Sequence, residues 1–208
     1  MALTGIFFSS FLIAFSGAMM PGPMFTATML MSSKRGFVSG PLIVMGHGTL
    51  EALLVVLLYL GFGGLLKNNA IMGSIGIAGG IMLLWMAFEA FRSPDNALTG
   101  GKKGLVHGSA YVAGIVTSLS NPYWIIWWVT IGLSYIVLSF RYSIQGILVF
   151  YAGHILADFV WYSIVALSFS FMQRFLSSKG FRAVTVISGI IFAGFAVYFI
   201  WFGIRNLV

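Results

Sequence analysis

Apolar residues form six long stretches along the chain, and charged residues stand mostly in the short segments between them. The stretches cover about residues 5–31, 38–66, 71–91, 106–138, 143–172 and 184–204. Each is long enough for an α-helix that crosses the hydrocarbon core of a bilayer, which takes roughly 20 residues. The pattern therefore predicts an all-α integral membrane protein with about six transmembrane helices.

Two of these stretches, the first and the fourth, contain prolines where a continuous helix is otherwise expected. Pro21, Gly22 and Pro23 interrupt the first, and Asn121 and Pro122 lie inside a run of 37 residues without a charged side chain. Proline lacks a backbone donor and clashes with the preceding helical turn. We therefore expect helices one and four to be broken at mid-membrane, where irregular backbone must face protein or a wet cavity.

The two halves of the chain share three features in the same order. His47 precedes Glu51 by four residues, and His154 precedes Asp158 by four, at an offset of 107. The two proline breaks follow at an offset near 100, and the third and sixth stretches align at 113. Three helices per half would place the halves in opposite orientations, as in secondary transporters. The pattern predicts two inverted three-helix repeats.

Composition and charge narrow the class of protein further. Hydrophobic residues make up 60% of the 208 residues and charged residues 7%, with no cysteine. Soluble domains carry about 25% charged residues, so a soluble protein is excluded. Disulfide scaffolds and thiolate metal sites are excluded as well. The net charge of +7 comes from short loops, which indicates membrane topology rather than binding of nucleic acid.

Basic residues are distributed unequally between alternate connections, eight on one side and three on the other. The positive-inside rule places the larger set in the cytoplasm. We expect a multi-pass protein of the cell membrane with both termini outside and no cleaved signal peptide, since the first 33 residues are uncharged. The whole chain, 1–208, is then one transmembrane domain: repeat one at about 5–92, a flexible cytoplasmic loop at 92–105, and repeat two at about 106–205.

Four ionisable side chains are expected near the bilayer centre. Glu51 and Asp158 lie 13 to 15 residues into their helices, where an ionised carboxylate needs a partner, a cavity or a proton. His47 and His154 share a helix face with these acids, and an imidazole beside a carboxylate can relay protons near neutral pH. We predict ion coupling for all four residues, although hydrogen-bonded packing is an open alternative for each.

The two helix breaks predict a binding site for the cargo. A half-helix that starts inside the membrane presents free N–H donors and a positive dipole end, which suit a substrate carboxylate. We therefore assign substrate binding to the residues at the breaks: Pro21, Gly22, Pro23, Asn121, Pro122 and the adjacent Tyr123. Glu51 or Asp158 would then accept a proton, a sodium ion or the substrate ammonium. We expect no metal site, although methionines around the first break leave metal-ion export as an alternative.

The chain resembles the LysE/RhtB translocators, the lysine and homoserine/threonine exporters, over nearly its whole length. The resemblance rests on Gly17-Ala18-Met19-Met20-Pro21-Gly22-Pro23, the spaced glycines Gly36, Gly40 and Gly46, Asn121-Pro122, and Asp158 with Trp161. Glu51 stands where many members have aspartate, Leu50 replaces the usual preceding glycine, Tyr123 stands where many have lysine, and Leu133 where proline is common. The resemblance implies amino-acid efflux driven by an ion gradient.

We therefore expect a secondary transporter that exports amino acids or similar small zwitterions by antiport with an ion, for which we take a proton, with sodium as the open alternative. The same fold could export metal ions or other small cations. An intramembrane enzyme fits less well, because the chain has neither His-Glu-x-x-His nor Gly-x-Ser-x-Gly, and a channel would need a selectivity ring. No cofactor is expected. Partners are the cargo, the coupling ion and the bilayer, and small-residue pairs such as Gly76 and Gly80 would pack helices within a monomer or a homodimer.

Overall fold

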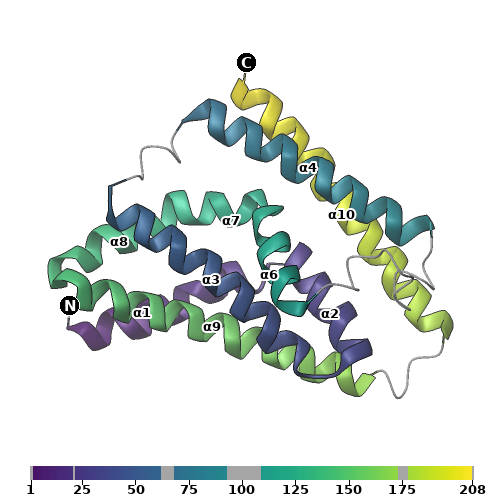
Figure 1. Ribbon diagram of the computed structural model, residues 1–208, viewed down its shortest axis with the longest axis horizontal. Coiled ribbons are helices and arrows are strands. Elements are labelled where there is room, and N and C mark those ends of the chain that lie inside the picture. The colour runs from purple at the N-terminus through teal and green to yellow at the C-terminus, as the bar shows by residue number, and fades with distance from the viewer. Residues whose placement is uncertain (1, 21, 62–67, 93–108, 173–177, 208) are drawn as a thin grey trace.

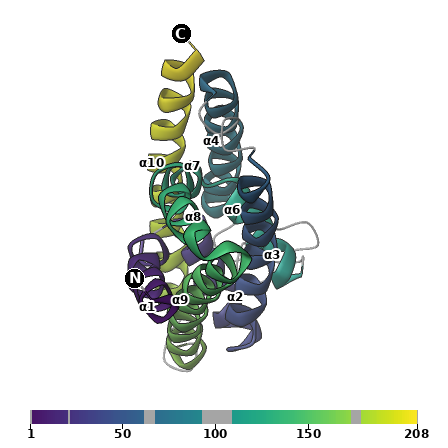
Figure 2. The same cartoon turned by 90° about the vertical axis from the view of Figure 1, so that its left-hand side faces the viewer.

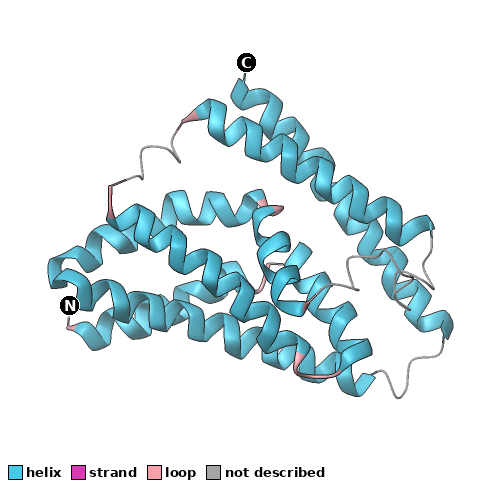
Figure 3. Cartoon of the chain, in the orientation of Figure 1, coloured by secondary structure: helices cyan, strands magenta, loops and turns pink. Residues whose placement is uncertain are grey.

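The computed structural model describes residues 2–20, 22–61, 68–92, 109–172 and 178–207. Every regular element in these ranges is helical, and they contain no strand (Figure 3). The all-α class expected from the apolar stretches is therefore confirmed. The loop at 92–105 lies largely outside the described residues, as does Pro21.

The first stretch is divided into two helices, α1 (Leu3–Ala18) and α2 (Pro23–Arg35), which meet at an angle of 81°. Gly22 precedes α2 with extended backbone, and Pro23 is its first residue, where the missing N–H has no helical partner to lose. Gly36 ends α2 with φ of 81°, a left-handed conformation that glycine adopts without steric cost. The first expected break is thus present.

The fourth stretch is divided in the same way, between α6 (Ala110–Leu119) and α7 (Pro122–Trp127). Asn121 caps α7, because its side-chain oxygen accepts a hydrogen bond of 3.1 Å from the backbone N–H of Tyr123. The chain continues through a π-helical turn, η3 (Trp128–Gly132), into α8 (Leu133–Ser139) and a short 3₁₀ turn, η4 (Phe140–Tyr142).

The other helices are α3 (Ser39–Tyr59), α4 (Asn69–Arg92), α9 (Ser143–Met172) and α10 (Ser178–Leu207). The bounds of α9 match the sequence expectation. Helix α3 ends at Tyr59 rather than near residue 66, and α10 begins at Ser178 rather than near 184. Apolar periodicity does not mark helix ends, which explains such differences.

Two groups of helices make up the molecule. In the larger group α1 and α2 lie along α9, and α3 lies along α6 and α9 (Figure 1). In the second, α4 and α10 lie side by side (Figure 2), and they contact α7 and α2 of the larger group. Small residues permit this close pairing, since a Cβ added to Gly76 would lie 3.0 Å from the Cα of Gly203.

Four described helices are long and apolar enough to cross a membrane, or five if the bent α1–α2 pair counts as one span. One of these spans, Tyr123–Phe171, is 49 residues long and contains a reversal of direction at η4, where Ser143 has φ of 54° (Figure 1). A stretch of this length is more than twice what one crossing requires. The protein is thus a multi-pass membrane protein, while six crossings and an inverted repeat stay predictions.

Candidate functional site

Two pairs of ionisable side chains face each other between α3 and α9. His47 and Glu51 lie one helical turn apart on α3, and His154 and Asp158 lie one turn apart on α9. All four residues are buried, none with more than 6% of its surface exposed. The sequence places the two pairs 107 residues apart, and the tertiary structure brings them together.

Each imidazole lies between the two carboxyl groups. His47 Nε2 is 3.1 Å from Glu51 Oε1 and 3.7 Å from Asp158 Oδ2. His154 Nε2 is 3.0 Å from Glu51 Oε2 and 3.6 Å from Asp158 Oδ2. The short contacts are thus made to Glu51, whereas those to Asp158 are too long for hydrogen bonds. The two acids, which the sequence presents as equivalents, have different surroundings.

Two tryptophans complete the surroundings of Glu51. The indole N–H groups of Trp124 and Trp128 each donate a hydrogen bond of 2.9 Å to Glu51 Oε1. The sequence analysis did not identify either residue. Their i, i+4 spacing directly after the Asn121-Pro122 break was the available signal, because it places both indoles on one face of the second half-helix.

The Nδ1 atoms of the two histidines, which are the ring nitrogens that do not contact the carboxyl groups, differ in their hydrogen bonds. His47 Nδ1 is 2.6 Å from the hydroxyl of Ser118 on α6, and Ser118 in turn donates 2.7 Å to the carbonyl of Gly114. His154 Nδ1 is buried and has no hydrogen-bond partner. Asp158 Oδ2 is also buried without a hydrogen-bond partner. Ser118 is a further residue that the sequence analysis missed.

A cavity of about 50 Å³ adjoins the four ionisable residues. It is lined from α1, α2, α3, α6, α7 and α9, and from residues at both helix breaks, including Ala14, Met20, Gly22, Met24, Phe25, Ser118, Asn121, Tyr123 and Trp124. The breaks themselves are adjacent, since a Cβ added to Gly22 would lie 3.6 Å from Asn121 Nδ2. A volume of this size holds a few water molecules and no amino acid.

The predicted substrate-binding residues are distributed around this cavity. Gly22, Asn121 and Tyr123 line it, and the Tyr123 hydroxyl donates 3.3 Å to the carbonyl of Ser16. Pro23 and Pro122 begin the half-helices α2 and α7, and Pro23 is not among the residues that line the cavity. Asn121 occupies one backbone donor of α7, so that half-helix offers fewer free N–H groups than the sequence suggested, whereas Gly22 provides no side-chain cap for α2.

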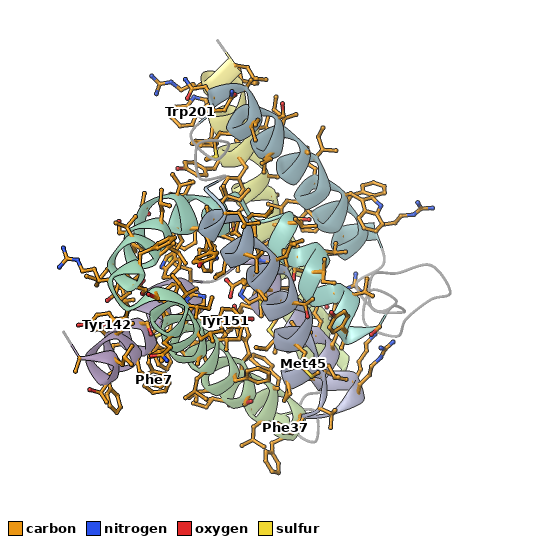
Figure 4. The ribbon with its side chains drawn as sticks, turned by 60° about the vertical axis from the view of Figure 1, so that its left-hand side comes forward. Phe7, Phe37, Met45, Tyr142, Tyr151 and Trp201 are labelled. Atoms are coloured by element: carbon orange, nitrogen blue, oxygen red, sulfur yellow. The ribbon has the colours of Figure 1, made fainter. Side chains whose placement is uncertain are left out.

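Tyr151 adds a connection between the same two helices. Its hydroxyl donates a hydrogen bond of 2.6 Å to the carbonyl of Gly48, the residue after His47. Figure 4 labels Tyr151 on α9. Half-buried Tyr151 lies on α9 one turn before His154. This bond holds α3 and α9 in register beside the ionisable cluster.

Three of the cluster residues could also hold a cation. One ligand atom each of His47, Glu51 and Asp158 lie within 4.8 Å of one another, and all three residues are buried. Imidazole and carboxylate ligands suit several divalent metals. His47 Nε2 and Glu51 Oε1 already contact each other, so a metal ion would have to replace this contact.

The model of the LysE type translocators matches residues 15–203, which include both helix breaks and all four ionisable residues. The chain belongs to this translocator family. YcgF of Bacillus subtilis (strain 168), by its name a candidate amino acid efflux protein, is 25% identical over 208 residues, covering 98% of this chain and 99% of YcgF. The chemotactic transduction protein ChpE of Pseudomonas aeruginosa is 26% identical over 200 residues, covering 93% and 97%. No solved structure matches this translocator.

Family membership confirms the resemblance read from the Pro-Gly-Pro and Asn-Pro motifs. It also makes the protein a membrane translocator rather than a member of an enzyme family. The cavity between the half-helices is lined by polar groups from both halves of this translocator.

Proposed function

We propose that this translocator exports amino acids or similar small zwitterions across the cell membrane by antiport with protons. The observation that carries the proposal is the buried cluster of His47, Glu51, His154 and Asp158 beside a cavity that both helix breaks border. A translocator needs polar groups inside the membrane for its cargo and for its coupling ion. The matches to both relatives cover nearly the whole chain, and the name of YcgF specifies amino acid efflux.

Proton coupling is supported by the chemistry of the cluster. Imidazole changes charge near neutral pH, and a buried carboxyl group binds a proton when its partners are removed. Two of each group lie within 3.7 Å of one another along the four contacts described above. A small displacement of α3 against α9 would alter these contacts, so proton binding and helix movement can be linked.

Binding of a zwitterion is supported by the half-helices. Gly22 leaves the first turn of α2 without a side-chain cap, and Met24 and Phe25 of that turn line the cavity. Backbone donors at a helix N-terminus attract a carboxylate. The acids of the cluster lie across the same cavity, where they suit an ammonium group.

The inverted repeat is supported by corresponding contacts in the two halves. Gly46 of α3 packs against the carbonyl of Tyr111 on α6, and Gly153 of α9 packs against the carbonyl of Phe7 on α1. The first half-helix of each broken pair therefore packs against a glycine of the other half of the chain: α1 packs on α9, and α6 packs on α3. Six crossings then follow if α1–α2 crosses once, the segment from α6 to α8 crosses once, and α3, α4, α9 and α10 each cross once.

The small cavity has a consequence for mechanism. About 50 Å³ is less than an amino acid occupies, so cargo can enter only after the half-helices separate. Separation at one face while the other stays closed is alternating access. In this proposal the cavity beside the cluster is open to one face of the membrane at a time.

Reconstituted vesicles provide the test. Purified protein in proteoliposomes should exchange labelled amino acid against the same unlabelled amino acid, and an imposed pH gradient should drive net accumulation. We expect Glu51→Gln and Asp158→Asn to reduce gradient-driven transport at least tenfold, because the amide keeps the shape of the carboxyl group without its charge or proton. Inserted protein is quantified for each variant.

Other outcomes identify the alternatives. Consumption of the amino acid indicates an enzyme, conductance without exchange indicates a channel, and transport of divalent metal alone indicates the cation exporter. If a sodium gradient drives accumulation and a pH gradient does not, the proton is replaced by sodium in the proposal. Wild-type rates in both variants would contradict a role for the acids.

A further inference from the structure

The two histidine–acid pairs are arranged alike in the backbone and differently in their hydrogen bonds. In both pairs the imidazole precedes the acid by one turn, and its Nε2 atom faces the centre of the cluster. The differences lie in the outer nitrogen of each imidazole and in the carboxylate oxygens. We call the pair on α3 the occupied half, because its polar atoms have hydrogen-bond partners, and the pair on α9 the open half, because two of its polar atoms have none.

The α3 half is occupied. Glu51 accepts hydrogen bonds at both oxygens, from two indoles at Oε1 and from His154 at Oε2, and His47 lies 3.1 Å from Oε1. His47 Nδ1 contacts Ser118 at 2.6 Å. A carboxylate has about four acceptor positions, so Glu51 has little capacity for another ligand.

The α9 half is open. His154 Nδ1 and Asp158 Oδ2 are buried atoms without hydrogen-bond partners, on residues that are 4% and 3% exposed. Both residues line the cavity. Buried polar atoms without partners are rare in folded proteins, because each costs free energy, so each calls for an explanation such as strain, a catalytic role, or a bound water molecule or ion. Two of them lie one turn apart here.

The sequence explains why His154 Nδ1 has no hydrogen-bond partner. The matching contacts of Gly46 with Tyr111 and of Gly153 with Phe7 relate α6 to α1 by 104 positions. The same offset pairs Ser118 with Ala14, and both residues line the cavity. Ala14 has no hydroxyl group, so the first half of the chain lacks the partner that Ser118 gives to His47.

We propose that His154 Nδ1 and Asp158 Oδ2 bind the ammonium group of the cargo, and that the α3 half is a fixed anchor. An ammonium group has three N–H donors and accepts no hydrogen bond. Asp158 offers an acceptor, and His154, whose Nε2 donates to Glu51, offers the lone pair of Nδ1 as another. The anchor consists of His47, Glu51, Ser118, Trp124 and Trp128. This inference rests on the proposed function, because it assigns one end of the same zwitterion.

A substitution that closes the open nitrogen tests the assignment. Ala14→Ser introduces on α1 the hydroxyl group that Ser118 provides on α6, so it should occupy His154 Nδ1. We expect the KM for amino acid counterflow to rise about tenfold in this variant, with an unchanged or slightly higher melting temperature. Asp158→Asn should raise KM at least as much. The labelled probe is the amino acid, among the twenty, that wild-type vesicles exchange fastest.

Ser118→Ala is the matched control, because it removes the hydroxyl group from the anchor. It should lower the melting temperature and raise KM less than Ala14→Ser does. Competition with analogues of the probe adds an independent measurement: the decarboxylated amine should inhibit wild-type counterflow, and the deaminated 2-oxo acid should inhibit it less. Ala14→Ser should weaken inhibition by the amine more than inhibition by the oxo acid.

The outcomes separate this inference from the proposed function. Wild-type vesicles that exchange none of the twenty amino acids would overturn the proposed function and the inference together. Normal wild-type exchange, with KM unchanged in Ala14→Ser and raised in Ser118→Ala, would overturn the inference and leave amino-acid export standing. Weaker inhibition by the oxo acid in Ala14→Ser, with inhibition by the amine unchanged, would place the carboxylate at His154 and also overturn it.

Discussion

Single side chains around Glu51 illustrate how a buried acid is stabilised inside a membrane protein. Trp128 is fully buried and donates to Glu51 Oε1 at 2.9 Å, and Trp124 donates to the same oxygen from one turn earlier. Hydrogen bonds to a charged acceptor are stronger than those between neutral groups. The indoles therefore contribute both packing and polar stabilisation at one position.

We predict that Trp128→Phe destabilises the protein by about 1–3 kcal/mol, because an acceptor of Glu51 loses a donor while the aromatic packing is largely retained. Chemical unfolding in detergent, followed by circular dichroism, measures the change. Proton-driven transport should fall as well.

Trp161→Phe is the control for this substitution. The indole nitrogen of Trp161 is buried without a hydrogen-bond partner, so removing its N–H group should be neutral or slightly stabilising. Equal destabilisation by both substitutions would show that ring volume, rather than the bond to Glu51, determines the effect.

Pairs of helices in this protein approach closely where one of them carries glycine. Gly46 faces the backbone carbonyl of Tyr111, and Gly114 faces that of Ile43, so α3 and α6 are in contact through their main chains. In membranes such contacts replace the hydrophobic driving force that soluble helices use. They also set the distance between Ser118 and His47.

At this scale we predict that Gly46→Ala destabilises the protein by about 1–3 kcal/mol, because an added methyl group cannot fit against the Tyr111 carbonyl without moving a helix. The melting temperature of the detergent-solubilised protein measures the effect. Gly194→Ala on α10 is the control, since a Cβ there meets nothing within 4 Å and alanine favours a helix over glycine, so stability should be unchanged or slightly higher. A similar loss in both variants would contradict the clash with the Tyr111 carbonyl as the cause.

The distribution of basic residues along the chain predicts the orientation of the molecule in the bilayer. Eight basic residues in alternate connections against three in the others predict that the loop around residue 98 is cytoplasmic and that η4 faces outward. The reversal at Ser143 would then lie at the outer surface, on the same side as both termini.

Cysteine labelling tests this topology without interference, because the chain has no native cysteine. In intact cells, an impermeant maleimide should label Ser143→Cys, and it should label Leu98→Cys only after the membrane is permeabilised. The opposite labelling pattern would contradict this orientation and would show that both termini and η4 face the cytoplasm.

Much of this architecture could be predicted from the sequence because it depends on local chemistry. Apolar stretches indicate helices in a membrane, prolines at 23 and 122 indicate where helices begin, and spacing of four residues places each histidine beside its acid. The bounds of α9 agree with that prediction. These properties involve neighbours along one helix, so the order of residues is sufficient to infer them.

Tertiary structure decided what the two halves share and where they differ. Glu51 and Asp158 each follow a histidine by four residues, yet of the two only Glu51 accepts the indole hydrogen bonds, because Trp124 and Trp128 reach it from 73 and 77 residues away. His47 has Ser118, whereas His154 Nδ1 has no partner. Such differences depend on which side chains meet across helices, and helical periodicity along one segment carries no information about the neighbour on the next.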